Sequence, residues 1–312
     1  MHSYRFPLLL LPLVCCLTFR AQAEPSSVPE RSPRTSLIAR GGILAAYHRM
    51  GLLVDLRLDL RRRLFDSDSL LLKDNYAQVT LSTVNSVAHT QSGGALEIAP
   101  TSFFRLKGGY DFLGYYGVLN ILLPLKDCQN ASALPAGDSR CDFHRDIGAG
   151  ATKEETADFG NRAWVEGLFQ ARLGLLSAVA TVSLEKWWFR KNWRAPMGFG
   201  YWYNSFHMVP QARSDEVLTH QSLLLYELLP DRGGTNPQLL AGLVDSLVRT
   251  SATNYTLNRL GVVVFLRFPQ LRVRDLTFMV AAQWYTHDRY LEGGAMPLIA
   301  ILVAMSSGDL LR

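Results

Sequence analysis

Apolar and charged residues alternate strictly from Val54 to Arg61, inside the stretch LLVDLRLDLRRRLFDSDS (52–69). A period of two predicts a β-strand, because successive side chains of a strand point to opposite faces of the sheet. One face of this strand is aliphatic, and the other carries Asp and Arg in turn. The sequence therefore predicts a strand that separates an apolar environment from a polar one.

The same two-residue rhythm recurs along most of the chain. The clearest further segments are 95–113, 162–174, 257–268 and 273–287, and less regular ones are 76–87, 178–188, 217–228, 239–249 and 297–309. With 52–64 they predict about ten strands, a number that a single closed barrel uses. Segment 95–113 is far longer than the usual strand of about 5–6 residues, which favours a tilted strand that crosses a membrane. Segment 36–48 is weakly patterned and stays unassigned.

Connector lengths support a membrane barrel independently of the alternation. With the first strand outward-going, the inner connectors are 88–94, 175–177, 229–238 and 269–272, and the outer ones are 65–75, 114–160, 189–216, 250–256 and 288–295. The two longest connectors fall on the same side, as expected for short periplasmic turns and long external loops. Aromatic residues near predicted strand ends, such as Trp187, Trp188 and Trp284, suit interfacial girdles.

These patterns predict an all-β fold, a closed antiparallel transmembrane β-barrel of about ten strands. Twelve strands are the alternative, because residues 197–208 (MGFGYWYNSFHM) could supply part of another hairpin. A soluble β-sandwich would also explain the aromatic residues, as core packing. The length and phase of the alternating segments favour the barrel.

The N-terminus has the pattern of a secretory signal. His2 and Arg5 precede an apolar run at residues 6–19, and AQA at 21–23 fits a cleavage site. The apolar run is shorter than the roughly 20 residues that a membrane-spanning helix needs. We expect residues 1–23 to be a cleaved signal peptide, 24–50 to be a periplasmic tail and 51–312 to form the barrel.

Composition and charge exclude some classes of function. The chain has 312 residues, 48% hydrophobic residues, a net charge of +5 and a mean hydropathy of +0.05. Its charges alternate in sign without a basic stripe, so nucleic-acid binding has no support. GAGATK (148–153) lacks the spacing of a phosphate-binding loop, and we expect no cofactor and no metal. Cys128 and Cys141 are expected to form one disulfide in an oxidising compartment.

Two longer stretches carry a resemblance. LRLDLRRRLFDSDSLLLKDNY and LEIAPTSFFRLKGGYDFLGYYG resemble an uncharacterised family of predicted outer-membrane proteins from myxobacteria and their relatives. The resemblance implies a bacterial outer-membrane β-barrel. For such a barrel we expect a monomer whose partners are outer-membrane lipid or lipopolysaccharide and the barrel-assembly machinery. The C-terminal GDLLR departs from many barrels because it lacks the terminal aromatic residue that they use as an assembly signal.

The polar strand faces define a predicted lumen. Barrels of this size are nearly filled by side chains, and an unpaired buried charge costs several kcal/mol. We therefore predict cross-strand ion pairs and little open conductance, in a structural, binding or narrow transport protein. The predicted lumen residues are Asp55, Arg57, Asp59, Arg61, Glu97, Arg105, Lys107, Glu166, Arg172, Asp245, Arg259, Arg267 and Asp275.

The tripeptide HQS supports an alternative function, an outer-membrane hydrolase. It resembles the active-site tripeptide of outer-membrane phospholipase A. On a strand, His220 and Ser222 of this chain would share one face, and the resemblance implies that the imidazole activates the hydroxyl. If Glu227 faces the lumen, this pair faces lipid. The residues after Ser222 depart from that family, and its downstream Asn has no match.

The acidic stretch FDSDS supports a second form of this alternative. Asp66 and Asp68 share a face at the expected outer end of the first strand, and His287 lies at the outer end of the ninth. Omptin proteases are similar in strand number and use an Asp pair opposite an Asp–His pair to activate water. Here His287 and Asp288 are adjacent, so on a strand they point to opposite faces.

Overall fold

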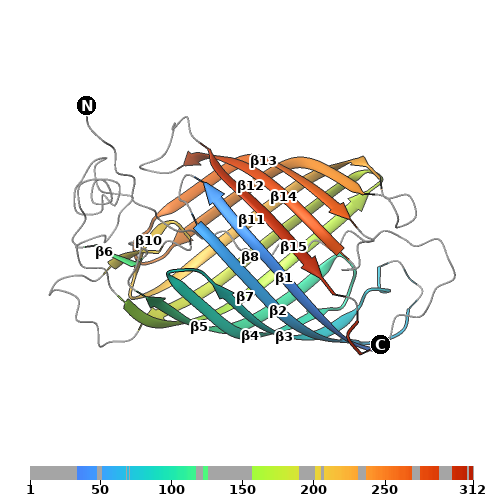
Figure 1. The fold of residues 1–312 in the computed structure, drawn as a ribbon, viewed down its shortest axis with the longest axis horizontal. Helices are drawn as coiled ribbons and strands as arrows, with labels where there is room; N and C mark the ends of the chain where they lie inside the picture. Colours follow the sequence, from blue (N-terminus) through green and yellow to red (C-terminus); the bar gives the residue numbers. More distant parts are fainter. Residues whose placement is uncertain are drawn as a thin grey trace.

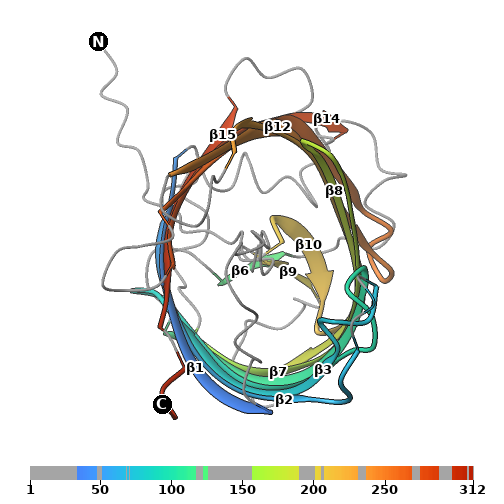
Figure 2. The same ribbon diagram turned by 90° about the vertical axis from the view of Figure 1, so that its right-hand side faces the viewer.

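Twelve strands of the chain form one closed antiparallel barrel (Figures 1 and 2). The computed structural model describes residues 34–47, 51–67, 69, 71–116, 122–125, 157–189, 201–204, 207–230, 237–268, 275–287, 297–307 and 309–311. The wall strands are β1 (Thr35–Tyr47), β2 (Gly51–Arg63), β3 (Tyr76–Asn85), β4 (His89–Ala99), β5 (Phe104–Tyr116), β7 (Ala157–Leu173), β8 (Leu176–Phe189), β11 (Ser214–Leu229), β12 (Gln238–Thr250), β13 (Thr256–Phe268), β14 (Asp275–His287) and β15 (Leu298–Ser306). Within these ranges no helix is long and apolar enough to cross a membrane.

The barrel closes at the pairing of β1 with β15. The register runs from Arg40 opposite Ser306 to Tyr47 opposite Ile299, and β1 pairs with β2 along its other edge. A closed sheet leaves no edge of unpaired N–H and C=O groups, which is what a strand surrounded by hydrocarbon requires. The fold is therefore a β-barrel of the outer-membrane type.

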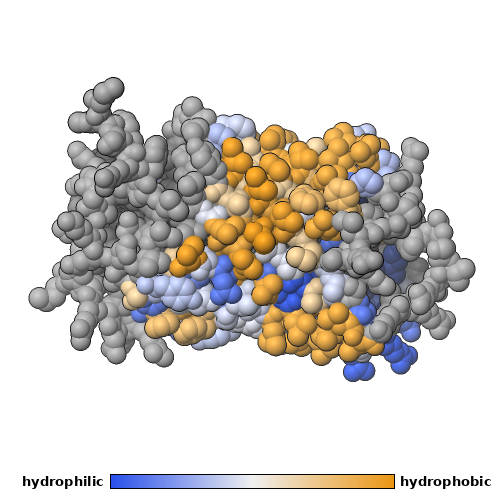
Figure 3. Space-filling model, viewed as in Figure 1, coloured by the Kyte–Doolittle hydropathy of each residue, from blue (hydrophilic) through white to orange (hydrophobic). Residues whose placement is uncertain are grey.

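Side chains alternate between the inside and the outside of this wall. On β11, Leu225 is fully buried, whereas its neighbour Leu224 is 45% exposed on the outer face. On β2, Leu56, Leu58 and Leu60 point outward in the same way. Apolar residues consequently gather over much of the outer surface, as Figure 3 shows for one face. The apolar phase predicted from the sequence is the lipid-facing phase.

The predicted count of about ten strands is too low, for two reasons. Segment 95–113 is two strands, β4 and β5, joined by residues 100–103. The break is hidden in the pattern because Phe104 lies six positions after Ile98, an even offset, so the apolar phase continues through the turn. There the hydroxyl of Thr101 accepts a hydrogen bond from the backbone N–H of Phe104, at 3.2 Å.

The second missed strand is β1, which lies in the segment left unassigned and inside the expected tail 24–50. The barrel therefore begins at Thr35, not at residue 51. Small residues at Ala39, Gly41 and Ala45 occupy outward positions of β1 and conceal its alternation. The expected signal peptide, residues 1–23, lies outside the described residues.

The additional strand β1 also reverses the direction in which the first predicted strands cross the barrel. Thr35 and Ser306, the ends of the wall, lie at one end of the barrel, which we call the terminal end. Segments 117–156 and 190–213 both connect strands at the opposite end, which we call the loop end. Residues 64–75, which were expected on the same side as these two segments, lie at the terminal end instead.

A small second sheet lies at the loop end, inside the outline of the barrel (Figure 2). It consists of β6 (Leu122–Leu125), β9 (Tyr201–Asn204) and β10 (Val209–Ala212), in the order β10-β9-β6. Residues 197–208 thus contribute to a hairpin, but the hairpin is not part of the wall.

Contacts with the wall hold this inner hairpin. The Trp202 ring packs edge-on against the Phe189 ring, with centroids 4.6 Å apart. The Thr253 hydroxyl donates to the carbonyl of Pro210 at 2.9 Å. Phe189 is an inward residue of β8, so the hairpin packs against the inner side of the barrel.

The role of β1 as a wall strand can be tested by truncation. Deleting residues 24–47 from the exported chain should abolish barrel closure, because β2 and β15 would both become free edges. Deleting only residues 24–33 should leave the heat-modifiable gel mobility of a folded barrel intact. Equal, wild-type mobility for both deletions would contradict the closure at β1.

Candidate functional site

All but one of the predicted lumen residues point to the interior of the barrel. They share the phase of the buried positions on their strands: Asp55, Arg57, Asp59, Arg61, Glu97, Arg105, Lys107, Glu166, Arg172, Arg259, Arg267 and Asp275. The exception is Asp245, which lies on the outer face of β12 between the buried Val244 and Ser246. Segment 239–249 alternates imperfectly because it is apolar on both faces, which is why its phase was predicted wrongly.

The interior has two unlike sides. Strands β2 to β8 carry most of its charges, whereas β11 to β14 present an apolar inner patch. The buried members of that patch are Leu223, Leu225, Leu240, Val244, Val263, Phe265, Met279 and Ala281. Val179 and Leu302, from the strands flanking this region, pack against it. Side chains of both kinds thus occupy the space that the wall encloses.

Near the terminal end, Asp59 organises a set of polar side chains on the charged side. Its carboxylate accepts hydrogen bonds from Gln78 at 2.9 Å and from Thr80 at 2.7 Å, and it pairs with Arg40 at 3.1 Å. Arg61 donates to the amide oxygen of Gln78 at 2.8 and 3.0 Å. The Asp59 side chain is only 1% exposed, so its charge depends on these partners.

Other predicted lumen charges also find partners. Asp55 and Arg57 pair along β2, and the Tyr76 hydroxyl donates to Glu97. Cross-strand partners at 2.6–2.8 Å are Arg172–Glu227, Arg267–Asp275 and Arg105–Gln170. In the register, Glu97, Lys107 and Glu166 form a row of alternating sign across β4, β5 and β7.

Nearer the loop end, Asp111 is the centre of a denser cluster. One of its oxygens accepts hydrogen bonds from Arg162 at 2.6 and 2.9 Å, from Trp164 at 2.9 Å and from Gln91 at 3.0 Å. Gly109 makes this arrangement possible, because a Cβ there would lie 2.6 Å from the Trp164 ring. The Asp111 side chain is 3% exposed, which leaves it almost no water.

Arg162 extends this cluster to Glu185 and the inner hairpin. The second carboxylate lies 3.4 Å from Arg162, and it accepts a hydrogen bond from the Trp187 indole at 2.8 Å. His207, which follows β9, places its Nε2 2.9 Å from the same oxygen. Asp111, Arg162, Glu185 and His207 therefore form a continuous chain from the wall to the inner hairpin, which we call the loop-end chain.

The predicted lumen set contains none of the four residues of the loop-end chain. Asp111 and Arg162 carried a usable signal, because both lie on the polar faces of clearly alternating segments. Glu185 lies in the less regular segment 178–188, and His207 lies in a segment with no assigned face. Their convergence depends on register and on the inward fold of the hairpin, which alternation alone does not specify.

The His–Ser pair of the hydrolase hypothesis forms on the outer face of β11. Ser222 Oγ and His220 Nε2 are 2.8 Å apart, and Glu227 faces the interior. Asp245 is the cross-strand neighbour of Ser222. An ionisable group on the lipid face destabilises a barrel most at the centre of the bilayer. This polar cluster therefore needs an explanation.

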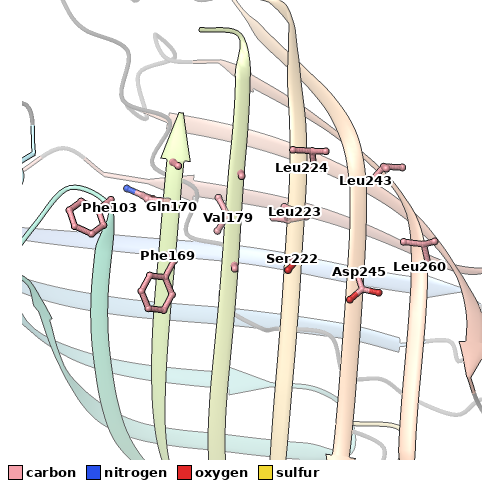
Figure 4. A pocket seen from close by; sticks show the side chains of 13 residues that line it. Phe103, Phe169, Gln170, Val179, Ser222, Leu223, Leu224, Leu243, Asp245 and Leu260 are labelled. Carbon is pink, nitrogen blue, oxygen red and sulfur yellow. The ribbon is translucent and has the colours of Figure 1, made fainter. Parts of the chain in front are cut away.

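A groove of about 640 Å³ runs beside Ser222 and Asp245 on the outer face (Figure 4). Its floor is formed by small residues, among them Ala178 and Ala180 of β8, together with Ser222. Larger apolar side chains rise around it: Phe169, Leu224, Leu243 and Leu260. The polar cluster thus lies at a recess in an otherwise apolar surface.

The register places this groove midway across the apolar belt. One row of cross-strand neighbours runs Phe104, Phe169, Ala180, Ser222, Asp245, Leu260 and Trp284. Phe104 begins β5 at the terminal end, and Trp284 lies near the loop end of β14. Because barrel strands tilt by about 35–45°, such a row rises across the membrane, and Ser222 lies at its middle.

The protease-like arrangement of Asp66, Asp68 and His287 does not form. Asp66 follows β2 at the terminal end, where it pairs with Arg63 at 3.1 Å. His287 ends β14 at the loop end, so the length of the barrel separates it from Asp66. The missed strand β1 reversed the first hairpin and caused this error. Asp68, together with Cys128, Cys141 and residues 148–153, lies outside the described residues.

The comparison with solved structures finds outer-membrane β-barrel proteins at low similarity. The β-domain of the Bordetella autotransporter BrkA is 9% identical, with 88% of this chain and 99% of that chain covered and a TM-score of 0.46. LpxR from Salmonella typhimurium is 10% identical, with coverages of 87% and 99% and a TM-score of 0.40. The KdgM porin is 9% identical, with coverages of 87% and 98% and a TM-score of 0.36. At these values the likenesses carry no inference about activity.

The sequence itself matches nothing in the other comparisons. No protein-family model matches the chain, and no curated protein matches it. The resemblance to the myxobacterial family therefore stays a prediction.

The buried charges of the loop-end chain should be energetically important. Asp111→Ala leaves Arg162 without its closest carboxylate, and breaking a buried pair in this way costs about 3–5 kcal/mol. The matched control is Lys186→Ala, whose partner Glu216 is exposed on the outer face and whose pair is worth under about 1 kcal/mol. Denaturant unfolding of the refolded barrel in lipid vesicles measures the free energy of unfolding of both variants. Equal losses of stability in the two variants would contradict the role of Asp111.

Proposed function

We propose that this protein is a bacterial outer-membrane β-barrel whose lumen is closed at rest by paired side chains. It serves as a structural or ligand-binding barrel, or as a narrow transport path that conducts only when its interior rearranges. The observation that carries this proposal is the loop-end chain, in which Glu185 joins Arg162 of the wall to His207 of the inner hairpin.

The electrostatics of the interior support a closed resting state. In a space of low dielectric constant, an unpaired charge is expensive, so charged side chains stay where partners and hydrogen bonds satisfy them. Asp59, Asp111 and Glu185 are each at most 4% exposed and each have several donors. A route for a solute along the charged side would need some of these bonds to open.

The outer surface supports the proposed location. A closed barrel with an apolar outer face and no free edge suits a bilayer, and the predicted export signal would deliver it to the periplasm. In the outer membrane, the loop end would face the exterior, since barrels place their long loops there. Outer-membrane lipid would cover the apolar belt.

The hydrolase alternative is less well supported. Ser222 and His220 are within hydrogen-bonding distance, which such an enzyme needs. However, Ser222 lies midway across the apolar belt, away from the ester groups and the water of the membrane surface. Asp245 lies beside Ser222, and within the described residues it makes no hydrogen bond or ion pair that would orient the imidazole.

Conductance through planar bilayers tests the closed lumen. The refolded wild-type barrel should show no large, steady, ion-selective current. Glu185→Ala removes the acceptor shared by Arg162, Trp187 and His207, and it should raise the frequency of openings several-fold. Glu185→Gln keeps a hydrogen-bonding side chain, so its frequency of openings should lie between those of the wild type and Glu185→Ala. A large, steady current through the wild-type barrel would overturn the proposal.

A separate assay tests the hydrolase alternative. Detergent-refolded protein should hydrolyse neither phospholipid nor peptide substrates above the background set by His220→Ala. Asp66→Ala should likewise change nothing, because Asp66 and His287 lie at opposite ends of the barrel. Turnover that either substitution abolishes would contradict this expectation.

A further inference from the structure

The polar cluster on the outer face has no role in a closed-lumen barrel surrounded by lipid alone. His220, Ser222 and Asp245 point away from the interior, at the middle of the apolar belt. Such groups inside a membrane usually mark a place where protein, not lipid, covers the surface. The question is which surface could satisfy an imidazole and a carboxylate at this depth.

The tilt of the wall places the two ionisable residues symmetrically about Ser222. His220 lies two residues, about 6.6 Å, along β11 towards the loop end, and Asp245 lies one strand, about 4.8 Å, across on β12. With a tilt of about 40°, His220 is about 5 Å and Asp245 about 3 Å nearer the loop end than Ser222. They therefore lie at similar depth, on opposite sides of a line along the membrane normal.

This arrangement is complementary to itself. A two-fold axis along the membrane normal, passing near Ser222, would place His220 of each copy opposite Asp245 of the other. The imidazole has a nitrogen besides the one near Ser222, and within the described residues Asp245 accepts no hydrogen bond. In such an isologous interface every contact occurs twice.

The shape of the surface also favours a second copy of the barrel as the partner at this face. Ala178, Ala180 and Ser222 form a floor of small residues, and small residues let membrane-spanning surfaces approach closely. Leu224 and Leu243, 45% and 51% exposed, flank this floor and can pack against the equivalent side chains of a second copy. A lipid tail would fill the groove but could not satisfy the carboxylate.

We propose that the barrel forms a homodimer through this face, with reciprocal Asp245–His220 contacts across a two-fold axis near Ser222. The dimer replaces the monomer expected from the sequence. It leaves the lumen unchanged, so the dimer and the closed lumen can fail independently.

Sedimentation in density-matched detergent tests the dimer. The wild-type barrel should sediment as a dimer, and Asp245→Leu or His220→Leu should each weaken dimerisation at least ten-fold. The double variant H220D/D245H should restore it, because the exchanged residues still face each other across the axis. Heat-modifiable mobility shows that each variant is folded. A wild-type monomer at all concentrations, or a double variant no better than the single ones, would overturn the proposal.

Cross-linking in native membranes provides a second test. Ser222→Cys, near the axis, should give a covalent dimer under mild oxidation. The matched control is Leu58→Cys, which is exposed on the outer face of β2 and should give none beyond the wild-type background. Equal cross-linking at the two positions would contradict the two-fold arrangement. Labelling of Ser222 by a fluorophosphonate would also contradict it, in favour of a catalytic serine.

Discussion

The structure depends on one constraint: a backbone surrounded by hydrocarbon must satisfy its own hydrogen bonds. Closure between β1 and β15 meets this constraint for the whole sheet. It also encloses the inward side chains, so that charges which could face water on an open sheet have to find partners inside. Both the pairing within the lumen and the apolar outer surface follow from the same closure.

The interior responds to enclosure in two ways. On the side of β11 to β14 it buries aliphatic and aromatic side chains, and on the side of β2 to β8 it pairs charges. The loop-end chain joins the second side to the inner hairpin through His207. In the proposed closed state, these bonds together hold the lumen shut, although each of them can open on its own. That combination suits a binding protein or an occasional path better than a permanently open pore.

Alternation predicted much of this fold because the phase of a strand is a local property. The faces of β2, β7, β13 and β14 follow directly from their residues. Two features of the wall could not be predicted in this way. The small residues of β1 hide its alternation, and the turn between β4 and β5 keeps both strands in one phase, so that they look like a single strand. The omission of β1 reversed the first hairpin and brought Asp66 wrongly to the same end as His287.

The sites were harder to predict than the wall. Pairing depends on register, which joins residues far apart in the sequence, such as Asp111 and Arg162. The inward hairpin that brings His207 to Glu185 has no signature in the alternation. Asp245 illustrates the converse case, since β12 is apolar on both faces and its single acid could belong to either. Only the structure places it beside Ser222.

The central claim is that packed, paired side chains fill the lumen while lipid covers the outside. The most direct measurement is the accessibility of nitroxide spin labels placed one at a time along Asp275–His287 in lipid vesicles. Outward positions such as Val280, away from the proposed dimer face, should collide freely with oxygen. Inward positions such as Ala281 should be shielded from both oxygen and a polar nickel reagent. High access of the polar reagent to the inward positions would show a water-filled channel and contradict the account.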